Sequence, residues 1–212
     1  MSDIVVFGAG GRAGRRTVAE ARRRGHRVTA VVRDPARYGG PADSGVRVAA
    51  GDVTEAADVA ALADGHDAAV NAAAVHGEGT DPEAFFTGAA HALVTGLRQA
   101  GVDRLIAVGL STLLPGPDGV RLLDAPGFPA EFRPFCLAHA AGLDLLRAQG
   151  ATLDWLYVSP SGDFDHDGGR TGRYRTRALG DLADRVSYED FALVLLDEID
   201  TPRHHRSHLA VT

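Results

Sequence analysis

Lysine is absent from this chain of 212 residues, and all 22 of its basic side chains are arginines. The absence excludes a phosphate-binding lysine of the Walker A type, a lysine that forms a Schiff base, and a catalytic tyrosine–lysine pair. Any chemistry that the chain performs must therefore use other acids, bases and nucleophiles.

Cysteine and long apolar runs are scarce as well. Cys136 is the only cysteine, so no internal disulfide can form, which agrees with a reducing compartment. No run reaches the roughly 18 apolar residues that a membrane span needs, and the first residues lack the pattern of a secretory signal. We expect a cytoplasmic protein without a membrane partner.

Excess positive charge is also missing. The formal net charge is -6, and the arginines are scattered among acidic residues instead of forming one long basic stripe. This balance argues against nucleic acid as a partner.

What the chain does have is enough apolar material for one substantial core. Its length and its 45% hydrophobic content suit one α/β domain and are short for two. We expect a single dinucleotide-binding domain over residues 1–212, in which about 159–212 form a small substrate-pocket portion. A monomer is favoured over a homodimer.

Short apolar runs alternate along the chain with longer stretches of helical periodicity. Continuous apolar runs are typical of buried parallel strands, and the right-handed crossover rule then predicts a Rossmann-type, doubly wound parallel sheet with helices on both faces. The expected strands are residues 4–7, 28–32, 46–50, 68–71, 104–108 and 153–158, with a final short strand at 208–212. The expected helices are residues 12–24, 55–63, 82–100, 131–149 and 188–198.

The first strand breaks into a glycine-rich turn and then into a helix. In such a unit Gly8 makes the tight turn, Gly10 and Gly11 let the backbone approach a pyrophosphate, and Gly14 lets the helix pack closely on the strand. The helix N-terminus then holds the phosphate. The candidate cofactor-binding residues here are Gly8, Gly10, Gly11, Arg12, Ala13 and Gly14.

The second strand ends at Arg33, at the position where such units discriminate the adenosine ribose. An acidic residue there favours a free 2′-hydroxyl, whereas an arginine offers a planar set of donors to a 2′-phosphate. The sequence therefore predicts NADP(H) in preference to NAD(H), with Arg12 and Arg37 as further positive charges. The neighbouring Asp34 is the alternative, because a small backbone shift would present its carboxylate instead.

Six motifs in a fixed order carry a family resemblance over almost the whole chain. They are GAGGRAG at 8–14, VVRDPAR at 31–37, GDV at 51–53, NAAA at 71–74, VGLST at 108–112 and SYEDFA at 187–192. The chain resembles an atypical short-chain dehydrogenase/reductase of the NAD(P)H-binding, NmrA-like and flavin-reductase-like group.

This resemblance adds five further residues to the candidate site and implies roles for four of them. Asp52, next to Val53, would bond the adenine amino group, Ala72 and Ala73 would line the adenine and ribose path, and Ser111 would lie beside the nicotinamide. For Asp52 the alternative is an N-cap of the helix that follows.

The chain departs from that family at the catalytic pair. In active short-chain dehydrogenases a tyrosine and, four residues later, a lysine lie on the helix after the fifth strand, and these positions correspond to Phe135 and His139. Phe135 has no proton to give. His139 is a candidate hydrogen-bond donor to the nicotinamide ribose, or an acid with a pKa near neutrality. A partly buried helix histidine without a catalytic role is the alternative.

A glycine-rich and charged segment, residues 159–177, is predicted to be a loop that forms one wall of the substrate pocket. Tyr174 within it, and Tyr157 just before it, are candidate proton donors. Asp163, Asp165 and Asp167 imitate the start of a calcium loop, but Tyr174 stands where that loop requires a glutamate. We predict no metal site, neither here nor at the histidines of 204–208.

Two functional classes remain open. The first is an NADPH-dependent oxidoreductase that transfers hydride to a small apolar or aromatic acceptor, such as a flavin, quinone or enone, with Ser111, His139 and Tyr174 as its candidate catalytic residues. The second is a catalytically silent NADP(H)-binding redox sensor. A biosynthetic isomerase or cyclase on the same scaffold is a further alternative.

Overall fold

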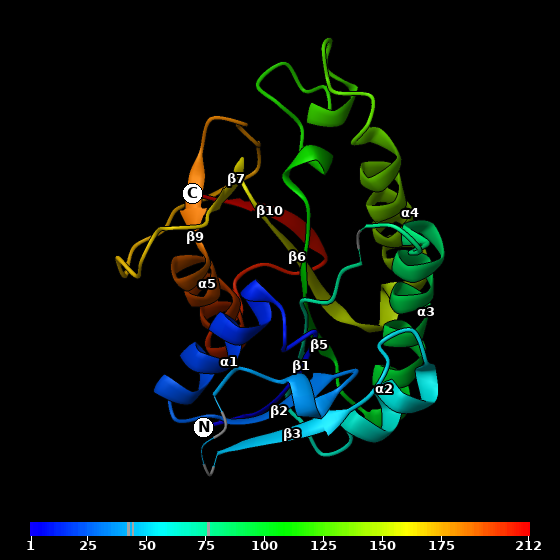
Figure 1. Cartoon of the computed structure of the whole chain (residues 1–212), viewed down its shortest axis with the longest axis vertical. Helices are drawn as coiled ribbons and strands as arrows, with labels where there is room; N and C mark the ends of the chain where they lie inside the picture. Colours follow the sequence, from blue (N-terminus) through cyan, green and yellow to red (C-terminus); the bar gives the residue numbers. More distant parts are fainter. Residues whose placement is uncertain (42, 44, 76) are drawn as a thin grey trace.

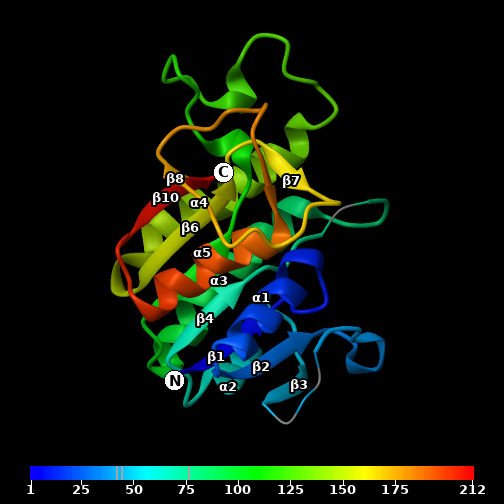
Figure 2. The same cartoon turned by 90° about the vertical axis from the view of Figure 1, so that its left-hand side faces the viewer.

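The computed structural model describes residues 1–41, 43, 45–75 and 77–212. An eight-stranded sheet of order β3-β2-β1-β4-β5-β6-β10-β8 runs through these residues, and a two-stranded sheet pairs β7 with β9 (Figures 1 and 2). The strands are β1 (Asp3–Phe7), β2 (Arg27–Val32), β3 (Val46–Ala50), β4 (Ala68–Asn71), β5 (Arg104–Val108), β6 (Asp154–Pro160), β7 (Asp163–Asp165), β8 (Thr176–Arg177), β9 (Arg185–Ser187) and β10 (Ser207–Val211).

Within the large sheet the described strands pair in parallel, except that β8 pairs with β10 in the antiparallel sense. Strand order reverses between β1 and β4, which is the topological switch point at which such sheets bind ligands. The predicted doubly wound α/β fold is confirmed.

Helices cover both faces of the sheet (Figure 1). One layer packs α2 (Ala56–Ala63), α3 (Pro82–Ala100) and α4 (Arg133–Gln149), and the other packs α1 (Arg12–Arg23) against α5 (Tyr188–Asp200). Alternation along β1 explains the two cores: Val5 and Phe7 pack with the α3 layer, and Ile4 and Val6 pack with the α1 layer. Because β1 is buried on both sides, it needs a continuous run of apolar residues, and residues 4–7 supply that run.

The segment at residues 159–177 is more ordered than predicted. It was expected to be a loop, but β6 extends to Pro160, and β7 and β8 lie within the segment. These strands have two or three residues and are formed by pairing with β9 and β10, which are distant in sequence. The alternation of apolar and polar residues that predicts a strand cannot be recognised over so few residues, so the sequence did not predict β7 and β8.

No helix among the described residues is long and apolar enough to cross a membrane.

A buried carboxylate joins the two helices of the α1 layer. Glu20 accepts hydrogen bonds from Arg23 and Arg24, and Arg24 also bonds Asp197 and Asp200 on α5. Burial acts to raise the pKa of Glu20, but the bonds from the two arginines outweigh it and lower the pKa to about 2.

Replacement of Glu20 by glutamine is expected to cost about 1.5–3 kcal/mol near neutral pH, the value of a hydrogen bond to a charged group. Because the folded pKa lies below the ordinary 4.5, wild type keeps this contribution above pH 4.5 and loses it as the pH falls toward 2. Urea unfolding at several pH values should therefore show the two proteins converging in acid. Glu131→Gln, at an exposed position, is the control, and a constant difference at all pH values would contradict the assignment.

Candidate functional site

The candidate site lies at the carboxyl ends of the parallel strands, the edge of the sheet to which the loops after β1 to β5 belong. Each loop carries one or more of the residues predicted from the sequence. Gly8 follows β1, Arg33 follows β2, Asp52 follows β3, Ala72 and Ala73 follow β4, and Ser111 follows β5.

The turn after β1 requires glycine at two positions. Gly8 has a φ of 74°, and a Cβ there would lie 2.4 Å from the backbone nitrogen of Ala73. A Cβ on Gly14 would lie 2.2 Å from the carbonyl oxygen of Gly8, so α1 can pack this closely on the turn only without a side chain. The turn therefore has the shape that the glycine pattern predicts.

The N-terminus of α1 is arranged to receive an anion. Gly11 is its N-cap and supplies no side-chain hydrogen bond, and the first turn holds no acidic residue. The N–H groups of Arg12 and Ala13 begin the helix at its positive end. These residues fit a pyrophosphate, as the sequence predicts for a dinucleotide.

A polar cleft of about 370 Å³ opens beside this helix end. Its lining residues are Arg12, Arg15, Arg16, His166, Asp167 and Tyr188. The guanidinium of Arg12 lies 2.5 Å from Nδ1 of His166, and Arg15 donates to the carbonyl oxygen of Gly10. The cleft thus brings the segment after β7 to the glycine turn.

The sequence analysis did not select His166 and Tyr188 as site residues. Tyr188 stood within the quoted SYEDFA motif, which offered a signal. His166 lies in an aperiodic stretch and had none.

The charged residues after β2 differ in their interactions with the rest of the protein. Arg33 and Arg37 are exposed and form no ion pair with another described residue. Asp34 instead accepts a hydrogen bond from the backbone nitrogen of Ala36, at 3.0 Å, and caps a short 3₁₀ helix. One oxygen of the carboxylate that offered the alternative to Arg33 is therefore engaged locally.

The loop after β3 is held by its own hydrogen bonds. Asp52 accepts from both the backbone nitrogen and the hydroxyl of Thr54, at 2.9 and 2.7 Å, and its own N–H donates to Asp58. Asp52 thus closes a turn two residues long, and the N-cap of α2 is Glu55, so the alternative N-cap role of Asp52 is wrong. Val53 is buried in the core beneath α3.

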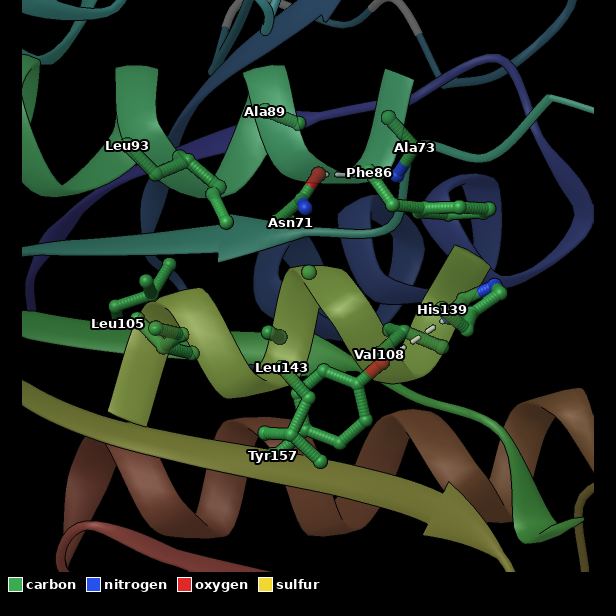
Figure 3. A pocket seen from close by; sticks show the side chains of 14 residues that line it. Asn71, Ala73, Phe86, Ala89, Leu93, Leu105, Val108, His139, Leu143 and Tyr157 are labelled. Carbon is green, nitrogen blue, oxygen red and sulfur yellow. Dashed lines mark hydrogen bonds between the residues drawn. The ribbon is translucent and has the colours of Figure 1, made fainter. Parts of the chain in front are cut away.

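An apolar cavity of about 40 Å³ lies between β4, β5, β6, α3 and α4 (Figure 3). Ala73 and His139 line it, with Asn71, Phe86, Leu143 and Tyr157. Its volume holds a few water molecules. Ala73 therefore contacts the glycine turn on one side and lines this cavity on the other.

His139 is enclosed by aromatic rings. The centroid of Phe86 lies 3.7 Å from that of the imidazole, and Phe135 meets the imidazole edge-on at 5.1 Å. Nδ1 of His139 is 3.1 Å from the hydroxyl of Tyr157 (Figure 3). Burial lowers the pKa of His139 to about 4. His139 is consequently neutral at physiological pH, and the predicted acid with a pKa near neutrality is wrong.

The other two catalytic candidates are not brought together with His139. Ser111 is buried at the start of a 3₁₀ helix after β5, on the correct edge of the sheet, but it does not line the cavity. Tyr174 packs with the α1 and α5 core on the opposite face, where its hydroxyl donates to Asp197. Burial and this carboxylate raise the pKa of Tyr174 to about 12. The prediction of Tyr174 as proton donor to this pocket is therefore wrong.

The side chains considered as metal ligands bond to other protein groups. His204 bonds Glu198 and His205 bonds Asp154, and Asp165 accepts from the backbone nitrogens of Asp167 and Gly168. Within the part of the chain that the structure describes, no three ligating side chains are grouped to hold a metal ion.

Comparison with known proteins places this geometry in a family. The family model described as NAD(P)H-binding matches residues 8–202. The chain is 33% identical to the uncharacterized protein YwnB of Bacillus subtilis, over 98% of this chain and 97% of that protein.

Two solved structures of similar sequence have the same fold over their full length. A protein of Burkholderia pseudomallei, provisionally named as exported, has a TM-score of 0.84 at 34% identity, with 100% of both chains covered. A protein of Streptococcus pneumoniae, provisionally named an NADH-flavin reductase, has a TM-score of 0.82 at 30% identity, with 100% of this chain and 99% of that chain covered. The glycine turn, the strand order and these matches together show that the chain belongs to the NAD(P)H-binding family of Rossmann-fold proteins.

Proposed function

We propose that the protein is an NADPH-dependent oxidoreductase that transfers hydride to a small apolar or aromatic acceptor of the flavin, quinone or enone type. The observation that carries the proposal is the meeting of the glycine turn and the apolar cavity at Ala73; at about 40 Å³ the cavity holds only one edge of such an acceptor, and the rest of the acceptor lies outside it. A dinucleotide whose pyrophosphate lies on α1 reaches toward this cavity along the carboxyl edge of the sheet. The similarity to the pneumococcal protein with the name of a flavin reductase supports the acceptor class.

The proposed cofactor site uses the residues of four strand ends. The pyrophosphate lies against Gly8, Gly10, Gly11, Arg12, Ala13 and Gly14. Arg33 bonds the 2′-phosphate, and Asp52, Val53, Ala72 and Ala73 border the adenine and its ribose. When NADPH is bound it supplies the hydride.

The proposed acceptor site contributes orientation more than acid catalysis. Phe135 and the neutral His139 stand where a tyrosine and a lysine would activate a carbonyl, and the chain has no lysine at all. His139 and Ser111 orient the acceptor or the nicotinamide ribose through hydrogen bonds. An acceptor of this class takes its proton from water, so the site does not depend on an activated tyrosine. In this proposal the protein acts as a monomer, and its substrate is a small molecule.

The test is NADPH oxidation by the purified protein with panels of flavins, quinones and enones, followed by loss of NADPH absorbance. We expect turnover with at least one acceptor class, and direct binding of NADPH by titration. His139→Leu is expected to lower kcat/KM by about 2- to 10-fold, the value of one neutral hydrogen bond. His91→Leu, at an exposed position on α3, is the matched control.

The replacement of the usual tyrosine and lysine by Phe135 and His139 favours one second candidate, a redox sensor that binds NADP(H) without turnover. Binding without oxidation in any panel would support that candidate and contradict the reductase. Equal affinity for NADP⁺ and NADPH would contradict the sensor, because such binding shifts no equilibrium between two states.

A further inference from the structure

The hydroxyl of Tyr157 and the imidazole of His139 form a buried pair behind the proposed acceptor site (Figure 3). We propose that Tyr157 is a positioning residue that holds His139 as the neutral Nε2–H tautomer, so that the ring presents one N–H donor to a neutral oxygen of the ligand. The identity of that ligand rests on the proposed function, whereas the tautomer does not.

The tautomer follows from the number of protons and acceptors. Tyr157 lies on β6 and is buried, and among the described residues its hydroxyl has one partner, Nδ1 of His139 at 3.1 Å. A phenol has a single proton, and a buried donor without an acceptor is costly. Donation from Tyr157 to Nδ1 satisfies both buried groups with the single bond between them, and the proton of the neutral imidazole is then on Nε2.

The orientation of the imidazole is fixed from three elements. Phe86 of α3 lies over the ring at 3.7 Å between centroids, with 36° between the planes, and Phe135 of α4 contacts it edge-on. Tyr157 of β6 completes the enclosure. Figure 3 shows the other edge of the imidazole turned away from Tyr157. Nδ1 of His139 therefore accepts a hydrogen bond inside the protein, and Nε2–H remains available to donate to a ligand.

The position of the tyrosine ring is itself built into the fold. A Cβ on Gly109, which follows β5, would lie 2.0 Å from the ring of Tyr157. On its other side Tyr157 meets His208 edge-on at 5.0 Å, and His208 bonds the hydroxyl of Ser159. The missing side chain at Gly109 therefore leaves the space that this ring occupies.

No described charged group lies in contact with the imidazole to stabilise a cation. Of the three side chains that contact the imidazole through a ring or a hydrogen bond, Phe86, Phe135 and Tyr157, only Tyr157 is titratable, and burial raises the pKa of that phenol. Burial also lowers the pKa of the adjacent His208 to about 4. His139 consequently differs from a lysine at the same position: it recognises a neutral oxygen, such as a ribose hydroxyl, a carboxamide or a ring carbonyl, and not an anion.

The experiment is two-bond ¹H–¹⁵N correlation NMR of the whole protein with ¹⁵N-labelled histidine, without nucleotide. Disappearance of one signal set in His139→Gln assigns His139 among the nine histidines. We expect the Nε2–H pattern in wild type from about pH 5.5 to 8, and a mixture of both tautomers in Tyr157→Phe. Tyr174→Phe is the matched control, because that hydroxyl bonds Asp197 on the other face of the sheet, and it should leave the His139 pattern unchanged.

A functional readout accompanies the spectra. Tyr157→Phe is expected to raise the KM for the acceptor or the Kd for NADPH by about 2- to 10-fold, and His139→Gln, which keeps an N–H donor, should retain more affinity than His139→Leu. A purely structural role of Tyr157 would lower stability without changing the tautomer.

Three results would overturn the proposal: an Nδ1–H pattern in wild type, an imidazolium that titrates near neutrality, or an unchanged tautomer in Tyr157→Phe. If Tyr157→Phe does not fold, the wild-type spectrum decides: an Nε2–H pattern with the ¹⁵N shift of a hydrogen-bonded Nδ1 supports the proposal, and the shift of a free Nδ1 overturns it. Failure of NADPH to bind, with the Nε2–H pattern present, would contradict the proposed function and leave the positioning role in place.

Discussion

Replacement of Arg33 by alanine is expected to weaken NADPH binding by about 10- to 150-fold and to leave NADH binding unchanged. The two nucleotides differ only in the 2′-phosphate, and hydrogen bonds to a charged group are worth about 1.5–3 kcal/mol. Arg33 is exposed at the end of β2, while the neighbouring Asp34 is engaged by Ala36. Titration of wild type and variant with each nucleotide measures the effect directly.

Arg98→Ala is the matched control for that measurement. It removes the same charge from an exposed position near the end of α3, at the opposite edge of the sheet, so it should change neither affinity. An equal loss for both nucleotides would show that Arg33 contacts a part that they share. No loss for either would contradict the assignment of Arg33 to the cofactor site.

Replacement of Arg104 by methionine is expected to destabilise the protein by about 3–5 kcal/mol, the cost of breaking a buried ion pair from one side. Arg104 begins β5 and is 7% exposed, and its guanidinium bonds the carboxylate of Glu198 at 3.0 Å. It also donates to the backbone carbonyls of Glu198 and His204, which joins the end of α5 to the start of β10. For a chain of this size the loss corresponds to a fall in Tm of about 6–20 °C.

Two further variants separate the ion pair from the loss of a long side chain. Arg147→Met removes an arginine whose partner Asp144 is exposed, and it should cost less than about 1 kcal/mol. Adding Glu198→Met to Arg104→Met should cost less than the sum of the two single changes, because each single change already removes the Arg104–Glu198 bond. A loss below 1 kcal/mol for Arg104→Met alone would contradict the structural role of this pair.

Much of the fold was predictable because its signals are local. The runs at 46–50, 68–71 and 104–108 coincide with β3, β4 and β5, and the helix at 82–100 coincides with α3. Asp81 caps that helix and Gly101 ends it in the left-handed conformation. Each of these features depends on residues within one or two turns of the chain, so the sequence carries them directly.

Part of the candidate site was predictable for the same reason. The roles of Gly8 and Gly14 in the turn follow from a short motif, and the parallel order of the strands then brings the loops after β1 to β5 to one edge. The sequence also showed that Arg33 lies beside Asp34. It did not show that Asp34 accepts a hydrogen bond from the backbone nitrogen of Ala36.

The sequence by itself determined the Rossmann-type sheet, the glycine turn and the absence of a tyrosine–lysine pair, because each is written in neighbouring residues or in composition. Tertiary structure alone decided that His139 is buried against Phe86 and Tyr157, that Tyr174 faces the other core, and that His166 reaches the glycine turn. These contacts join residues 18 to 154 positions apart. The pKa of a side chain and the partner of a hydroxyl depend on which distant elements pack around them, and no local pattern records that.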